Sequence, residues 1–118
     1  MDLGKYIGTI PEGDHIARVT DVEFGTSKKN TPQFIFTVHF QDLDVSGKVF
    51  YPETNDMLWK LTRDLGAAEV LRDGDAYSDD LSSMAREIKE DLSDRAIVYS
   101  VTKNGQYTNY EVTGVSFA

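Results

Sequence analysis

The chain has 118 residues, no cysteine, 40% hydrophobic and 27% charged residues, and a formal net charge of -8. These values favour a single globular domain over residues 1–118 and exclude a disulfide-stapled scaffold, a thiolate zinc site and a largely disordered chain. Because no apolar run approaches about 18 residues and no charged-then-apolar leader is present, we expect a cytoplasmic protein that neither spans a membrane nor is secreted.

The first 24 residues are expected to supply an arm and a strand. A Pro-Glu-Gly-Asp turn signal ends an arm, residues 1–14, that lies over the core through three apolar side chains: Tyr6, Ile7 and Ile10. The strand of residues 15–24 has apolar side chains in two pairs of opposite parity: Ala17 and Val19, then Val22 and Phe24. We therefore expect a β-bulge at residues 20–21, which inserts one residue and turns all four side chains to one face.

Residues 32–51 carry the clearest strand signal. Four apolar side chains alternate with polar ones in the first half: Phe34, Phe36, Val38 and Phe40. Alternation returns after the turn-forming DLDVSG, and we predict a β-hairpin with an aromatic core face and an outer face of flat, polar and basic groups. The preceding loop, residues 25–32, carries Lys28 and Lys29. It is either a solvated hairpin tip, which lysine pairs in turns favour, or a basic finger over a ligand groove.

Two helices are predicted next. The first spans residues 54–66, with a cap at Thr54 or Asn55, a leucine stripe, and a stop at Gly66. Trp59 lies off the stripe, where it would widen the buried face or cover the barrel end, and we expect core packing rather than ligand binding.

The second helix is predicted over residues 80–92, where five apolar side chains form one stripe behind a cap at Asp79 or Asp80. The linker between the helices contains Asp-Gly-Asp, whose carboxylates suggest calcium. Their spacing does not match the twelve-residue EF-hand loop, so we expect a solvated acidic loop.

The chain closes with a second predicted hairpin over residues 97–115, turning at Asn104-Gly105, a type I′ signal. Tyr110 and Val112 are its expected core contacts on the returning strand. The element order predicts a mainly β fold, a five-stranded OB-fold-like Greek-key barrel with one or two helices between strands 3 and 4. Residues 67–94 would form an acidic helical insertion. An unrelated small antiparallel α+β sheet has the same element order.

Catalytic chemistry is not expected. The two histidines, His15 and His39, lie on predicted strands without a second ligand type at metal-site spacing. Nucleophile elbow, Walker loop and dinucleotide fingerprints are missing. We therefore predict no catalytic residues, no metal and no cofactor.

A binding surface is predicted instead. In an OB-fold, ligands bind the outer face of strands 2 and 3 and the flanking loops. The side chains expected there combine cations with flat groups: Arg18, Lys28, Lys29, Ile35, Thr37, His39, Lys48, Phe50, Lys103 and Tyr107. Single-stranded nucleic acid needs this combination, because cations follow the phosphates and aromatic rings stack on bases.

The distribution of charge leaves this prediction open despite the acidic total. Residues 69–94 hold nine acidic and three basic side chains, a net charge of -6, whereas the remaining 92 residues hold eleven acids and nine bases. Phosphate partners select basic surfaces, and such a surface can exist outside the acidic segment.

Most of the chain resembles phage-encoded OB-fold single-stranded DNA-binding proteins. The resemblance lies in IPEGDHIARVTDVEFGTSKKNTPQFIFTVHF, the strand GKVFY, the helix LWKLTRDLGA and the hairpin YSVTKNGQYTNYEVTGV. It implies sequence-independent binding of single-stranded DNA in phage replication or recombination, in the host cytoplasm. Many such proteins end in an acidic tail that recruits partners, whereas this chain ends in GVSFA. We hypothesise that residues 69–94 bind replication or recombination proteins instead.

Two other functions remain open. The first is a small acidic protein-interaction module that binds a host factor or mimics DNA with its carboxylates. The second is an enzyme acting on nucleic acid, which lacks an evident general base or metal site. The preference between DNA and RNA and the oligomeric state are also open, since exposed edge strands would allow a homodimer.

Overall fold

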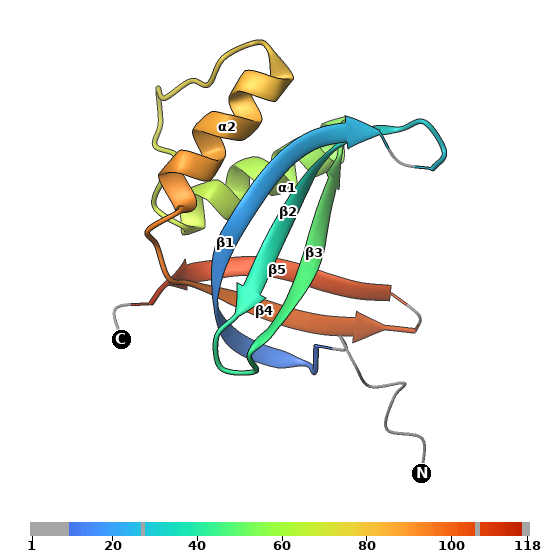
Figure 1. Cartoon of the computed structure of the whole chain (residues 1–118), viewed down its shortest axis with the longest axis vertical. Helices are drawn as coiled ribbons and strands as arrows, with labels where there is room; N and C mark the ends of the chain where they lie inside the picture. Colours follow the sequence, from blue (N-terminus) through green and yellow to red (C-terminus); the bar gives the residue numbers. More distant parts are fainter. Residues whose placement is uncertain (1–9, 27, 106, 117–118) are drawn as a thin grey trace.

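The described part of the chain forms one open antiparallel sheet with two helices (Figure 1). The computed structural model describes residues 10–26, 28–105 and 107–116. Within them the elements are β1 (Gly13–Thr26), β2 (Pro32–Phe40), β3 (Val45–Pro52), α1 (Asn55–Ala67), α2 (Leu81–Leu92), β4 (Ile97–Asn104) and β5 (Tyr107–Val115). The sheet order is β3-β2-β1-β4-β5, so β3 and β5 are its edges. The predicted mainly β fold is confirmed, whereas the sheet is not closed into a barrel.

Strand β1 joins the two halves of the sheet. Residues 13–17 pair with β4, and residues 17–26 pair with β2. The register with β2 shifts between Val19 and Asp21, which confirms the predicted bulge. Val19 and Val22 are both buried as a result. Because β1 bends, the β4–β5 hairpin runs across the direction of β2 and β3 (Figure 1).

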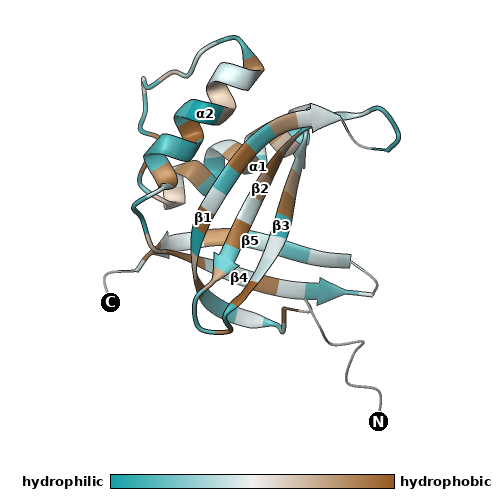
Figure 2. Ribbon diagram, viewed as in Figure 1, coloured by the Kyte–Doolittle hydropathy of each residue, from teal (hydrophilic) through white to brown (hydrophobic). Residues whose placement is uncertain are grey.

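The core lies between the sheet and the helices. Figure 2 shows hydrophobic residues alternating with hydrophilic ones along β1, β2 and β3. The four apolar side chains of the central strand are all buried, as their alternation predicts: Phe34, Phe36, Val38 and Phe40. Each such side chain contributes about 2 kcal/mol through its burial. The helices add apolar side chains to the same core: Leu61, Leu65, Ala85, Ile88 and Leu92.

Helix α1 begins where the sequence predicts and ends later. The Thr54 hydroxyl accepts a hydrogen bond from the Met57 N–H at 3.3 Å, which confirms the cap. The helix continues through Gly66, so the predicted stop is misplaced. It ends in a Schellman motif, in which the N–H groups of Glu69 and Val70 donate to the carbonyls of Gly66 and Leu65. Glu69 occupies the left-handed position, φ 61°, that glycine usually fills.

The two helices expose different faces. Trp59 on α1 is 76% exposed, so its predicted place in the core is wrong. Its distance from the leucine stripe turns it outward instead of widening the buried face. Helix α2 begins at the predicted cap, Asp80, whose side chain accepts a hydrogen bond from the Ser83 N–H at 3.1 Å. It packs against β1 and buries Ile88 and Leu92 in the core.

The remaining predictions concern the two ends of the chain. Ile10 is buried as expected, whereas Tyr6 and Ile7 lie outside the described residues. The second hairpin is confirmed, because β4 and β5 pair in antiparallel fashion up to Asn104 and Tyr107. Residue 106 lies outside the described residues, so the type I′ turn stays a prediction. No helix in the described parts of the chain is long and apolar enough to cross a membrane.

Candidate nucleic-acid interface

The outer face of β2 and β3 brings the predicted sheet residues together. Ile35 is paired with Phe50, and Thr37 with Lys48, across the antiparallel ladder. Paired side chains on one face have Cβ atoms about 5 Å apart, so each pair forms one local surface. Phe50 is 47% exposed and Lys48 is exposed. An aromatic ring and an ammonium group therefore lie on the same edge strand.

His39 contacts two side chains of the β2–β3 hairpin, one through a hydrogen bond and one through an ion pair that forms when the ring is protonated. Its Nδ1 lies 3.2 Å from Ser46 Oγ, and its Nε2 lies 3.4 Å from Asp44 Oδ1. This arrangement contains the groups of a Ser-His-Asp triad. However, the Asp44 side chain is 94% exposed and Ser46 is exposed as well, so water competes for every contact. We assign the three groups to hairpin stability.

The face becomes acidic toward β1. Arg18 is the β1 neighbour of His39, but Asp21 is the neighbour of Thr37 and Glu23 the neighbour of Ile35. Asp21 is paired with Lys89 of α2 at 3.1 Å, and this hydrogen bond lowers the pKa of the Asp21 carboxyl. Sequence reasoning placed Arg18 on this face and missed the two carboxylates. A phosphate chain therefore meets a more favourable charge along β3 than across β1.

A groove of about 270 Å³ lies between the two edges of the sheet. It is lined by residues of β3, α1 and β5: Lys48, Val49, Phe50, Met57, Lys60, Thr108, Asn109 and Tyr110. Two of the predicted site residues, Lys48 and Phe50, line it. The groove adds hydrogen-bonding groups from β5 and a second lysine from α1. The sequence alone could not predict this groove. Its β3 and β5 walls are about 60 residues apart in the chain, and only the curvature of the folded sheet brings the two edges near each other.

A buried carboxylate of α1, Asp64, holds one of the groove residues, Lys60. Asp64 of α1 is 1% exposed, and it accepts hydrogen bonds from the Tyr51 hydroxyl at 2.6 Å and the Val112 N–H at 3.2 Å. Lys60 Nζ lies 3.4 Å from the same carboxylate and also donates to the Tyr110 carbonyl. Burial, Tyr99 and the Asp64 charge raise the pKa of Tyr51 well above its ordinary value. Helix α1 is thereby tied to both sheet edges.

The predicted loop residues lie in the β1–β2 loop and near the tip of the β4–β5 hairpin, which both project from the same side of the molecule in Figure 1. Lys28 and Lys29 are exposed in the β1–β2 loop, and Lys103 and Tyr107 are exposed near the tip of the β4–β5 hairpin. Both projections extend past β3 on the right of Figure 1. Tyr107 is 77% exposed, and the Lys103 N–H donates to Glu12 at 2.6 Å. The loops therefore flank the side of the molecule on which β3 presents its edge.

The acidic segment is internally hydrogen-bonded. The Tyr77 hydroxyl donates to Asp91 at 2.9 Å, and the Ser78 hydroxyl donates to Glu87 at 2.6 Å. Burial and the Asp91 carboxylate raise the pKa of Tyr77. Both hydrogen bonds connect the linker to α2, so the linker is held against that helix.

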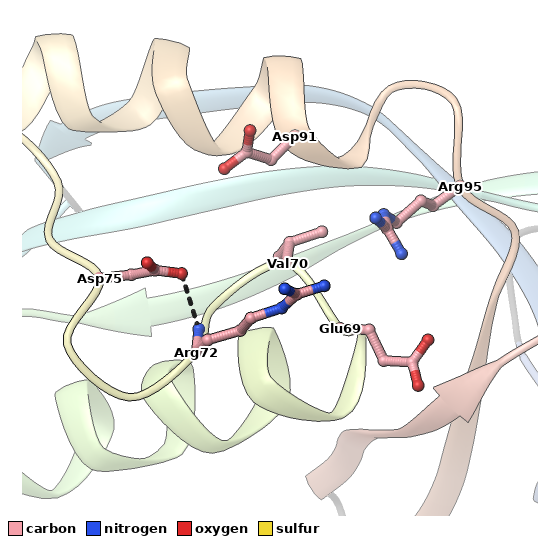
Figure 3. Close-up of a pocket in the computed structure, with 6 residues that line it drawn as sticks. All are labelled: Glu69, Val70, Arg72, Asp75, Asp91 and Arg95. Carbon is pink, nitrogen blue, oxygen red and sulfur yellow. Dashed lines mark hydrogen bonds between the residues drawn. The ribbon is translucent and has the colours of Figure 1, made fainter.

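A pocket of about 280 Å³ lies in this segment (Figure 3). Its lining mixes two arginines with three carboxylates and one apolar side chain: Glu69, Val70, Arg72, Asp75, Asp91 and Arg95. The backbone N–H of Arg72, not its guanidinium, donates to the Asp75 carboxylate at 2.9 Å. Such mixed charge suits neither a phosphate nor a metal ion. Among the described residues no group of three or more histidines and carboxylates could hold a metal.

No protein-family model matches the chain, and no curated protein matches it.

Proposed function

We propose that this protein is a non-catalytic, sequence-independent single-stranded DNA-binding protein. One observation supports it: an exposed ring, Phe50, and an exposed cation, Lys48, lie two residues apart on the same edge strand and both line a groove. Flat rings stack on any base, and cations follow the phosphates without reading sequence. The flanking loops supply further cations at Lys28, Lys29 and Lys103.

The proposed fold is an open relative of the OB-fold. The strand order β3-β2-β1-β4-β5 supports it, because pairing β3 with β5 would close the sheet into a five-stranded barrel. Helix α1 packs against both of these edge strands. The proposed setting is phage DNA replication or recombination in the host cytoplasm, which the sequence resemblance implies.

The test is a titration of the protein into fluorescein-labelled poly-dT of about 30 nucleotides, long enough for several OB-fold footprints. Duplex DNA, RNA of the same length and raised salt provide the comparisons. We expect tight, salt-sensitive binding to the single strand alone. Absence of binding at low salt would refute the proposal.

A Phe50→Ala variant tests the site itself. Loss of one stacked base should weaken binding about 5- to 100-fold without changing the melting temperature, because Phe50 is half-exposed. Phe50→Tyr keeps the ring and should bind as the parent does. Normal binding by Phe50→Ala would exclude this face.

The second candidate is an acidic protein-interaction module. The hydrogen bonds that hold Asp91 and Glu87 in place favour it, since a carboxylate array needs fixed positions to act as a recognition surface. The same array underlies the hypothesis that residues 69–94 recruit replication proteins. Failure to bind DNA, together with retention of a partner after nuclease treatment, would favour the module.

A further inference from the structure

Trp59, the one tryptophan of the chain, is 76% exposed. It lies on α1, turned away from the leucines that pack into the core. Four side chains of this helix line a shallow pocket of about 380 Å³: Asp56, Trp59, Lys60 and Arg63. The ring is therefore presented to solvent between two cations and one carboxylate.

This pocket and the groove share one lining residue, Lys60. Its ammonium is held by Asp64 and the Tyr110 carbonyl. Arg63 is anchored to β5 by Glu111, with 3.5 Å between Nη2 and Oε1. The Arg63 side chain is still 61% exposed and has further N–H groups to donate. A chain leaving the groove at Lys60 would thus meet Trp59 and Arg63 next.

We propose that Trp59 is a base-stacking residue, and that single-stranded DNA bound in the groove continues over α1 with one base on this ring. Arg63 would contact an adjacent phosphate. The inference rests on the proposed function and extends its binding site beyond the sheet. A second copy of the chain is a poorer occupant, because a two-fold interface here would bring the two Arg63 side chains and the two Lys60 side chains into mutual proximity.

The tryptophan itself reports the contact. Because the chain has one tryptophan, its intrinsic emission reports position 59 alone. We expect unlabelled oligo-dT of about 16 nucleotides, the upper OB-fold site size, to quench this emission with the same Kd as labelled-oligomer anisotropy gives. Binding by anisotropy with unchanged tryptophan emission would overturn the inference and leave the proposed function standing. No change in either signal would refute both.

Oligomer length separates stacking at Trp59 from a general loss of structure. Trp59→Ala should weaken binding of the 16-nucleotide oligomer about 5- to 100-fold, while an oligomer of about 6 nucleotides that fills only the groove should lose much less. Trp59→Phe should restore most of the loss. Equal losses for both lengths would contradict the inference.

The charge contact has a matched control in α2. Arg63→Gln should weaken the 16-nucleotide complex, whereas Arg86→Gln, the same change on the exposed face of α2, should not. Sedimentation of the free protein gives a further check. A dimer that becomes monomeric in Trp59→Ala would assign the surface to self-association and overturn the inference.

Discussion

Helices α1 and α2 are alike in length and amphipathic pattern, yet they are attached to the sheet by different chemistry. Helix α1 carries a buried carboxylate, Asp64, that binds groups on β3 and β5. Helix α2 buries only apolar side chains and adds one exposed ion pair, between Lys89 and Asp21. Outward, α1 presents Trp59 among cations, whereas α2 belongs to the acidic segment. The periodicity that builds a helix does not decide what its exposed face can bind.

The first prediction concerns the attachment of α1. Asp64→Ala should lower the free energy of unfolding by about 3–5 kcal/mol, because it leaves the Val112 N–H and the Tyr51 hydroxyl buried without their acceptor. Lys89→Ala in α2 should cost only about 0–1 kcal/mol, since its ion pair is exposed to solvent. Denaturant unfolding of the two variants makes the comparison. Similar losses would show that the helices are attached alike.

The second prediction compares two buried tyrosines. Tyr51→Phe removes the donor to Asp64 and should cost about 1–3 kcal/mol. The Tyr99 hydroxyl is buried and has no hydrogen-bond partner among the described residues, so Tyr99→Phe should be neutral or slightly stabilising. Thermal melts of both variants test this. A loss at Tyr99→Phe equal to that at Tyr51→Phe would contradict the assigned network.

The third prediction uses pH to act on a site away from both helices. His15 donates to Asp42 and to the Pro11 carbonyl, each at 2.7 Å. Burial alone would lower the pKa of His15, but these hydrogen bonds outweigh it and raise the pKa above 6.5. The resulting stability is fully present below the unfolded-state pKa and is lost as pH rises through the folded-state pKa.

Unfolding free energies measured from about pH 6 to pH 8.5 should therefore fall, and Asp42→Asn should flatten this dependence. The decrease should be the same in Lys89→Ala, because α2 takes no part in it. A parent protein whose stability is flat or rises over this range would contradict the His15 assignment.

Local sequence patterns predicted those features of the fold that depend on neighbouring residues, namely the buried strand faces and the bulge. The alternation around Phe36 predicted a buried face, since every second side chain of a strand points the same way. The parity change between Val19 and Val22 predicted the bulge. The barrel was not predictable in this way, because closure depends on whether β3 and β5 meet.

The candidate site was only partly predictable for the same reason. Lys48 and Phe50 were found because they share one parity on one strand. Asp64 was missed because its partners lie 13 and 48 residues away, and only the fold brings them to it. Trp59 gave a usable signal in its position off the leucine stripe, but a large apolar side chain was assumed to be buried.

The proposed DNA-binding side at β3 and the acidic side at α2 are compared most directly by the salt dependence of oligo-dT binding. It is measured for the parent and for one variant on each side. Each phosphate contact contributes about 0.7 to the slope of log K against log salt for single strands. We predict that Lys48→Gln reduces the slope by about 0.7 and that Arg86→Gln leaves it unchanged. A parent slope near zero, or an equal change in both variants, would contradict a nucleic-acid interface on β3.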